Sequence, residues 1–273
     1  MATGTSIWQK IRKGWAILGS LALVVFVGWC LSAFRATGEA KDALAGDDLI
    51  PVVRGDGYWF FTPTDVEGTS PLGFVFFPGA LVDPAAYAPL TRAVALAGYP
   101  ALLVDVPRRS ALGGADGPEV IERAIRGMQA DPGAVKWVIA GHSRGGAIAS
   151  RFVHERNWRA AGLILIGTSH PRDFSLAHVT LPTMKILGSL DRISPPEKSE
   201  ANRHLLPKGS KWMVIPGGNH SQFGWYGLQP GDRFATIGRE LQQQAMIEAV
   251  LKTMETAARA GRSPFKITSP DDV

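Results

Sequence analysis

The chain has 273 residues, of which 45% are hydrophobic and 19% are charged, and this composition excludes a disordered or low-complexity protein. Its formal net charge of +5 is spread along the chain, and no stripe of Lys and Arg alternates with aromatic residues, so a nucleic-acid partner is not expected. Because Cys30 is the single cysteine, the chain forms neither an intrachain disulfide nor a cysteine-based metal site.

The strongest shift in composition lies near the N-terminus. Residues 15–34 contain no charged side chain, and a helix of this length crosses about 30 Å of hydrocarbon. Lys10, Arg12 and Lys13 precede this stretch, so the positive-inside rule predicts a cytoplasmic N-terminus. We therefore predict a single-pass anchor in the cell membrane, with the large domain on the periplasmic or extracellular side. A cleaved signal peptide, which would give a secreted protein, is the alternative.

Four segments divide the chain: residues 1–34 as stub and anchor, 35–54 as a polar tether, 55–258 as one folded domain and 259–273 as a flexible tail. In the folded domain, apolar stretches alternate with helix-forming ones. Strands are predicted at residues 72–77, 101–106, 137–140, 163–166, 183–187 and 211–215, with an antiparallel edge strand at 58–61. Helices are predicted at residues 84–97, 118–130, 144–155, 195–206 and 237–258.

This alternation predicts an α/β fold, in which a mostly parallel central sheet is flanked by helices on both faces. Such sheets bind their ligands at the carboxyl ends of the strands. The polar residues that directly follow each strand are therefore the candidates for chemistry.

A candidate nucleophile follows the strand at residues 137–140. The order Gly141-His142-Ser143-Arg144-Gly145, placed between a strand and a helix, is typical of a sharp turn that projects the serine hydroxyl from the sheet. Glycines on both sides allow the strand and the helix to approach each other closely. A glycine-rich turn with a solvated serine has the same pattern, so the prediction of Ser143 as nucleophile depends on the later strands.

An acid and a base follow two later strands in the order that this fold requires. Asp191 comes after the strand at residues 183–187, and His220 comes after the strand at residues 211–215. As general base, His220 would accept the proton of Ser143, while Asp191 would fix the imidazole tautomer. Two other acids, Asp173 and Asp232, are alternatives, but neither directly follows a strand.

Two backbone amides are predicted to form an oxyanion hole: that of Arg144, next to the nucleophile, and that of Ala80, in the turn after residues 72–77. Residues 167–182 leave no room for a cap domain, which predicts an open pocket. The predicted substrate pocket is lined by Leu81, His142, His170, Phe223 and Trp225.

These stretches resemble the α/β-hydrolase superfamily, in particular its compact members without a cap domain, called alpha/beta hydrolase fold-5 proteins. The matching stretches are FFPGALVDPAAYAPL, AGHSRGGAIA, LGSLDRISPP and GGNHSQFGWYGLQPGD, and the resemblance covers residues 55–258. It implies a hydrolase without metal or cofactor and a triad of Ser143, Asp191 and His220. Arg144 departs from the apolar residue common at this position in esterases, which leaves the specificity open.

The predicted function is that of a membrane-anchored serine hydrolase, which cleaves carboxylic ester-type bonds of a small molecule through an acyl-Ser143 intermediate. A hydrolase relic that binds a ligand without cleaving it is one alternative. An acyltransferase or peptidase that uses the same three residues is another. The lipid bilayer is the predicted partner, and the sequence predicts neither the physiological substrate nor the oligomeric state.

Overall fold

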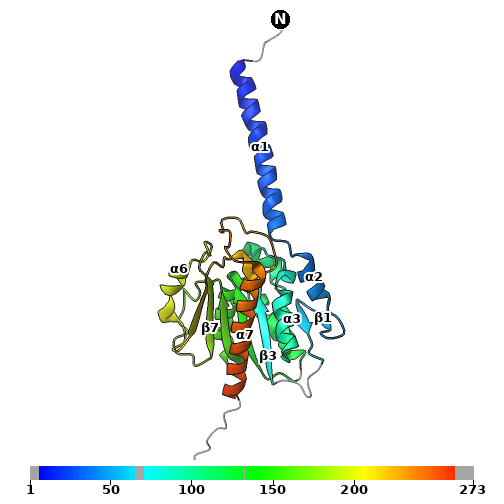
Figure 1. The fold of residues 1–273 in the computed structure, drawn as a ribbon, viewed down its shortest axis with the longest axis vertical. Helices are drawn as coiled ribbons and strands as arrows, with labels where there is room; N and C mark the ends of the chain where they lie inside the picture. Colours follow the sequence, from blue (N-terminus) through cyan, green and yellow to red (C-terminus); the bar gives the residue numbers. More distant parts are fainter. Residues whose placement is uncertain (1–5, 65–70, 132, 262–273) are drawn as a thin grey trace, which may run out of the picture.

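The computed structural model describes residues 6–64, 71–131 and 133–261 (Figure 1). One eight-stranded sheet has the strand order β1-β2-β4-β3-β5-β6-β7-β8. The strands are β1 (Val52–Gly55), β2 (Tyr58–Phe61), β3 (Leu72–Phe77), β4 (Ala101–Val104), β5 (Lys136–His142), β6 (Ala160–Ile166), β7 (Thr183–Gly188) and β8 (Lys211–Ile215). The six strands β4, β3, β5, β6, β7 and β8 are parallel to one another. Strand β2 is antiparallel to both of its neighbours, β4 and β1.

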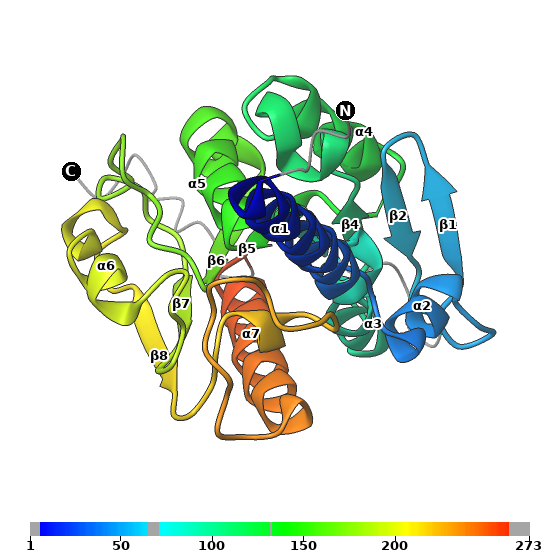
Figure 2. The same ribbon diagram turned by 90° about the horizontal axis from the view of Figure 1, so that it is seen from above.

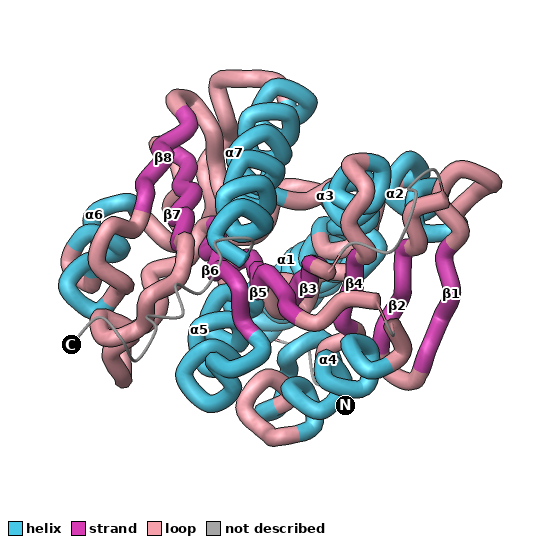
Figure 3. The backbone as a smooth tube through the Cα atoms, turned by 90° about the horizontal axis from the view of Figure 1, so that it is seen from below, coloured by secondary structure: helices cyan, strands magenta, loops and turns pink. Residues whose placement is uncertain are grey.

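Helices cover both faces of the sheet (Figures 2 and 3). They are α1 (Ile7–Ala33), α2 (Gly38–Ala45), α3 (Ala88–Leu96), α4 (Glu119–Gln129), α5 (Arg144–Arg156), α6 (Pro196–Glu200) and α7 (Arg239–Gly261). One face packs against α3 and α7, and the other packs against α4 and α5. This arrangement confirms the predicted fold class.

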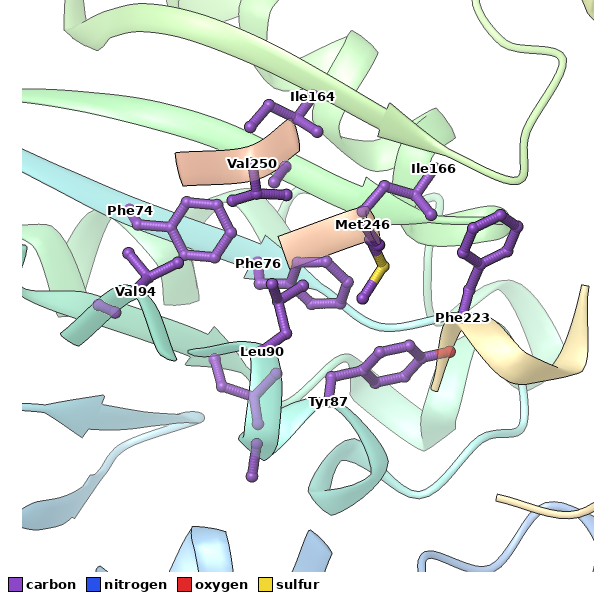
Figure 4. Packing of buried hydrophobic residues seen from close by; sticks show 14 of the residues in the cluster. Phe74, Phe76, Tyr87, Leu90, Val94, Ile164, Ile166, Phe223, Met246 and Val250 are labelled. Atoms are coloured by element: carbon purple, nitrogen blue, oxygen red, sulfur yellow. The ribbon is translucent and has the colours of Figure 1, made fainter. Parts of the chain in front are cut away.

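The central strands are apolar along their whole length because both of their faces are covered. All six residues of β3 are buried, and alternate residues enter opposite layers of the core. Phe74 and Phe76 lie in the layer of α3 and α7 (Figure 4), whereas Val75 and Phe77 lie in the layer of α4 and α5. The central strand therefore joins the two halves of the core.

The segment expected to be a polar tether is part of the packed domain. Residues 35–54 include α2 and β1, and their buried side chains include Ala40 and Ile50 in the core. The small side chain of Ala40 lets α2 lie against α3 and the residues before it, while the polar residues of α2 face outward. Because β1 pairs with β2, β1 rather than residues 58–61 forms the edge of the sheet.

The two ends of the chain differ in how they meet the domain. At the C-terminal end, α7 continues to Gly261, beyond the expected boundary at residue 258, and the rest of the expected tail (residues 262–273) lies outside the described residues. At the N-terminal end, α1 stands away from the domain (Figure 1), and every residue from Ile7 to Trp29 is exposed. This helix is long and apolar enough to cross a membrane, although an N-terminal signal sequence has the same properties.

Candidate active site

A strained turn between β5 and α5 carries Ser143. Its backbone has φ 53° and ψ −118°, a conformation that L-residues rarely adopt and that turns the hydroxyl away from the sheet. Two glycines make the turn possible. A Cβ on Gly141 would lie 2.2 Å from the Gly145 carbonyl oxygen, and a Cβ on Gly145 would lie 1.9 Å from the carbonyl oxygen of Phe77. The backbone of α5 therefore lies directly against the end of β3.

A buried acid–base pair lies at the ends of β7 and β8. The Nδ1 atom of His220 is 2.8 Å from Oδ2 of Asp191, and neither side chain is exposed to solvent. The Ser194 amide donates a second hydrogen bond, of 2.6 Å, to Asp191 Oδ1. Burial raises the pKa of Asp191, while His220 and the Ser194 amide act in the opposite direction. An ionised carboxylate at this distance accepts the proton of Nδ1, and in a neutral imidazole Nε2 is then the acceptor nitrogen.

The two other candidate acids lie elsewhere. Asp232 accepts hydrogen bonds from the amide and the hydroxyl of Ser221, at 2.9 and 2.7 Å, so it fixes the loop that carries His220. Asp173 is exposed on the connection between β6 and β7. Of the three acids, Asp191 is the one whose carboxylate bonds to the imidazole of His220.

His142 connects the strained turn to the acid–base pair. Its ring lies against that of His220, with 4.4 Å between the ring centroids, and it directly precedes Ser143. The Nε2 atom of His220 is buried and makes no hydrogen bond within the described residues. Hydrogen bonds of this kind are often long or open before a ligand binds. Within the described residues, Nε2 of His220 is thus an unpaired buried nitrogen, and its ring contacts the residue that precedes Ser143.

The predicted oxyanion donors belong to two segments that touch. The turn after β3 is held on both sides of Ala80: the Gly79 amide donates to the hydroxyl of Tyr87 at 3.2 Å, and the Leu81 amide donates to the Arg109 carbonyl at 2.7 Å. In the part of the chain that the structure describes, the Ala80 amide donates no hydrogen bond. The Arg144 amide opens α5, where the first amides of a helix have no partner within the helix.

A cavity of about 180 Å³ adjoins Ser143. It is lined by Ser143, Arg144, Gly167, Thr168, Ser169, His170, Arg172, Ile193 and Ser194, which follow β5, β6 and β7. Of the five predicted pocket residues, His170 lines this cavity. Burial and the positive charges of Arg172 and Arg144 lower the pKa of His170 to about 4, so its imidazole is neutral at pH 7.

The other four predicted pocket residues lie outside this cavity. His142 is buried, donates to or accepts from the Tyr87 hydroxyl at 2.8 Å, and has a pKa well below the ordinary value because of burial and the nearby His220. Phe223 is also buried, with its ring against that of His142. Leu81 is exposed and Trp225 is half-buried. Contact of these four residues with a substrate stays a prediction.

Sequence reasoning missed most of the polar lining of the cavity. Thr168 and Ser169 directly follow β6, so the rule that placed Asp191 and His220 also applies to them. The charge of the cavity comes from its two arginines. Arg144 pairs with Asp116, whereas Arg172 donates to the Ser169 hydroxyl and has no acidic partner among the described side chains. The cavity therefore presents an uncompensated positive charge.

A buried lysine supports the wall of the cavity. Lys185 lies in β7, and its Nζ donates a hydrogen bond of 2.8 Å to the carbonyl oxygen of His170. Burial, with a smaller contribution from Arg172, lowers the pKa of Lys185 to about 7.

Among the described residues, no group of three or more His, Cys, Asp or Glu side chains is placed to hold a metal ion.

Comparison with known proteins finds the same fold. Residues 73–244 match the sequence profile of a family described as "Alpha/beta hydrolase family". A thermophilic esterase of the planctomycete Thermogutta terrifontis has a TM-score of 0.54 and 19% identity, over 80% of this chain and 94% of that chain. The carboxylesterase CesB of Bacillus subtilis has a TM-score of 0.56 and 10% identity, over 79% and 94%. No curated protein sequence matches the chain.

The close approach at Gly145 predicts a large effect of one methyl group. We expect Gly145→Ala to lower the free energy of unfolding by about 1–3 kcal/mol or more, because the added Cβ must displace the carbonyl groups of Phe77 and Pro78. Gly38→Ala is the matched control, since a Cβ at this helical position meets no atom within 4 Å. Urea unfolding in detergent measures both. Equal stability of the two variants would contradict this account of the turn.

The buried Lys185 predicts that stability rises with pH. The pKa of this lysine is about 10.5 in the unfolded chain, whereas burial lowers the pKa to about 7 in the folded protein. Between these values the unfolded state binds more protons, so the free energy of unfolding rises with pH over this window. We expect this rise to be smaller in Lys185→Met. If the free energy of unfolding depends on pH in the same way in both proteins, the ammonium group of Lys185 is not desolvated in the folded state.

Proposed function

Because the chain belongs to the alpha/beta hydrolase family, we propose that it is a serine hydrolase that cleaves carboxylic esters through an acyl-Ser143 intermediate. The observation that carries this proposal is the buried hydrogen bond between His220 and Asp191, next to a serine held in a strained turn. A carboxylate that holds the imidazole proton on Nδ1 leaves Nε2 as the base. Three residues distant in the sequence thereby supply a nucleophile, a base and an acid.

The proposed reaction has two halves. In the first, Ser143 Oγ attacks the ester carbonyl carbon while Nε2 of His220 takes the hydroxyl proton. The carbonyl π electrons move to the oxygen, which the amides of Ala80 and Arg144 stabilise. The oxyanion then collapses, the bond to the alkoxy group breaks, and His220 protonates the leaving alcohol. In the second half, water repeats these steps on the acyl-enzyme, which releases the acid and restores Ser143.

We further propose that α1 anchors the enzyme in the cell membrane, with residues 15–34 in the bilayer. Its exposed apolar surface supports an anchor, because such a surface is unfavourable in water. The basic residues before this stretch support a cytoplasmic N-terminus and a catalytic domain on the outer side. N-terminal sequencing of the membrane-bound protein distinguishes the anchor from a cleaved signal peptide.

The positive cavity supports a substrate with a negative group close to the scissile bond. Arg172 and Arg144 both line the cavity beside Ser143, and the neutral imidazole of His170 adds no charge there. An ester whose alcohol part bears a carboxylate or phosphate would place that group near Arg172. We therefore propose an anionic leaving group as the preferred one.

Covalent labelling tests the nucleophile. A fluorophosphonate probe should label the wild-type protein and fail to label Ser143→Ala, because the phosphorus bonds to the serine oxygen. Asp191→Asn should slow labelling by about 10⁴-fold, since the imidazole then adopts the wrong tautomer. Ser175→Ala is the control, because this serine is exposed and does not line the cavity. A wild-type protein that resists the probe would refute the proposal.

Arg172 should determine the preference for anionic esters. The measurement compares kcat/KM for an ester that bears a carboxylate in its alcohol part with kcat/KM for its neutral isostere. We expect Arg172→Gln to lower the ratio of these two values by about tenfold, because the substitution removes one partly screened charge pair. Arg259→Gln, an exposed position near the end of α7, should leave the ratio unchanged. If both variants keep the wild-type ratio, the cavity charge does not select the substrate.

A further inference from the structure

The base of α1 is hydrogen-bonded to the loop that carries His220. The Gly227 amide donates to the Ala33 carbonyl at 2.8 Å, and the Thr37 amide donates to the Trp225 carbonyl at 2.9 Å. Between these two bonds, Ala36 forms an isolated β-bridge with Tyr226. The chain therefore leaves α1 and enters the domain bonded to the loop that follows His220, through one β-bridge and the two hydrogen bonds beside it.

The base of α1 also contacts the loop of the proposed oxyanion hole. The Asp83 amide, in the loop after β3, donates to the carbonyl oxygen of Phe34 at 2.9 Å. The side chains of Ala33 and Ala36 are buried, and Phe34 packs against the core. Only residues 34–37 separate α1 from α2. Because these residues are bonded on both sides, they do not act as a flexible spacer.

This attachment fixes which end of the domain faces the membrane. Figure 1 shows α1 rising from one end of the domain, while α7 ends at the opposite end, and Figure 2 looks onto the end from which α1 rises. The apolar stretch of α1 extends to Phe34, and contact with the domain begins at Ala33. When α1 spans a bilayer, the carboxyl ends of the strands therefore lie at the membrane surface.

The loops at this end carry side chains suited to a membrane surface. Leu112, after β4, is 89% exposed, and Phe234, after β8, is 80% exposed. Arg35, Arg192 and Arg233 are also exposed there and make no ion pair in the parts of the chain that the structure describes. Apolar side chains that enter the headgroup region, combined with arginines that meet anionic lipids, are the features by which proteins bind membrane surfaces.

The size of the cavity limits how much of a substrate it holds. Its volume of about 180 Å³ is below the roughly 300–1,000 Å³ of sites that enclose a whole drug-sized ligand. Its lining is mostly polar and positively charged. An acyl chain therefore finds no apolar space inside the cavity, and the polar end of an amphiphile is what fits.

We propose that the active-site end of the domain rests on the bilayer and that the substrate is an amphiphilic ester held in the membrane. Its anionic polar end enters the cavity beside Arg172, the scissile carbonyl meets Ser143 at the edge, and its apolar chain stays among the lipids. This inference rests on the proposed serine hydrolase and its anchor. In this orientation, Leu112, Phe234 and the base of α1 form the end of the domain that faces the membrane.

The orientation is tested without reference to activity. The full chain with Cys30→Ser is reconstituted into phosphatidylcholine–phosphatidylglycerol vesicles, and an environment-sensitive fluorophore is attached to Leu112→Cys or Phe234→Cys. Leu96→Cys, at the end of α3, is the matched control, because Leu96 is also an exposed leucine, 57% accessible. We expect nitroxide-labelled lipids to quench the fluorophore at residues 112 and 234 and not at residue 96. Equal quenching at all three positions, or none at 112 and 234, would overturn the orientation.

The substrate class is tested by moving the domain away from the membrane. A flexible polar segment of Gly and Ser, inserted between Leu31 and Ser32, leaves the bonded residues 33–37 intact. We expect it to reduce cleavage of an anionic fluorogenic ester lipid in the vesicles by about tenfold or more, because proximity acts as an effective concentration. Cleavage of a water-soluble short-chain ester should not change.

Each result of this experiment is informative. An insertion variant that cleaves both esters like the wild type would refute a membrane-held substrate while leaving the serine hydrolase intact. A wild-type protein that cleaves the soluble ester and not the ester lipid would refute it as well. A wild-type protein that is not labelled by the fluorophosphonate probe and cleaves neither ester would refute the proposed function itself, and the quenching measurement would still decide the orientation.

Discussion

The close approach between α5 and the end of β3 is the constraint on which the candidate site depends. Because Gly145 has no side chain, the first turn of α5 touches the carbonyl groups of Phe77 and Pro78. This contact accompanies the strained backbone of Ser143, and it places the segment that leads from β3 to the Ala80 turn against the start of the helix. The proposed nucleophile and both proposed oxyanion donors thus lie at one backbone contact, and the Tyr87 hydroxyl also holds the Ala80 turn through the Gly79 amide.

The opposite side of the site depends on buried polar contacts. Asp191 and His220 are both inaccessible to solvent, and a buried carboxylate is stable only where it is fully hydrogen-bonded. Asp232 holds the following loop through Ser221, and that loop continues to residues 225–227, which pair with the base of α1. The loop that fixes the imidazole is therefore also the loop to which α1 is attached. The proposed membrane anchor and the acid–base pair are thus connected to the same loop.

The sequence predicted the features that depend on local pattern. The residues of β3 and β8 were predicted with their observed bounds, because their short length and the turn residues that follow them favour strands over helices. It failed where burial depends on distant partners: residues 35–50 look polar in sequence, yet Ala40 and Ile50 enter the core. Proximity in sequence guided the choice of candidate pocket residues, and it does not indicate which side chains line the cavity. His142 and Phe223 adjoin functional candidates in the chain, but their side chains lie among buried residues, whereas Arg172 reaches the cavity from a loop without a motif.

The connection between β6 and β7 explains why a membrane surface suits this site. Residues 167–182 contain no helix or strand, so among the described residues nothing there forms a lid over the cavity. Electrostatic stabilisation of an oxyanion is strongest where water is excluded. In the proposed orientation the lipid headgroups and the apolar chain of the substrate would cover the open side of the cavity. In that orientation, a small, positively charged cavity at the base of the proposed anchor would need no cap of its own, because the bilayer would both hold the proposed substrate and shield the reaction.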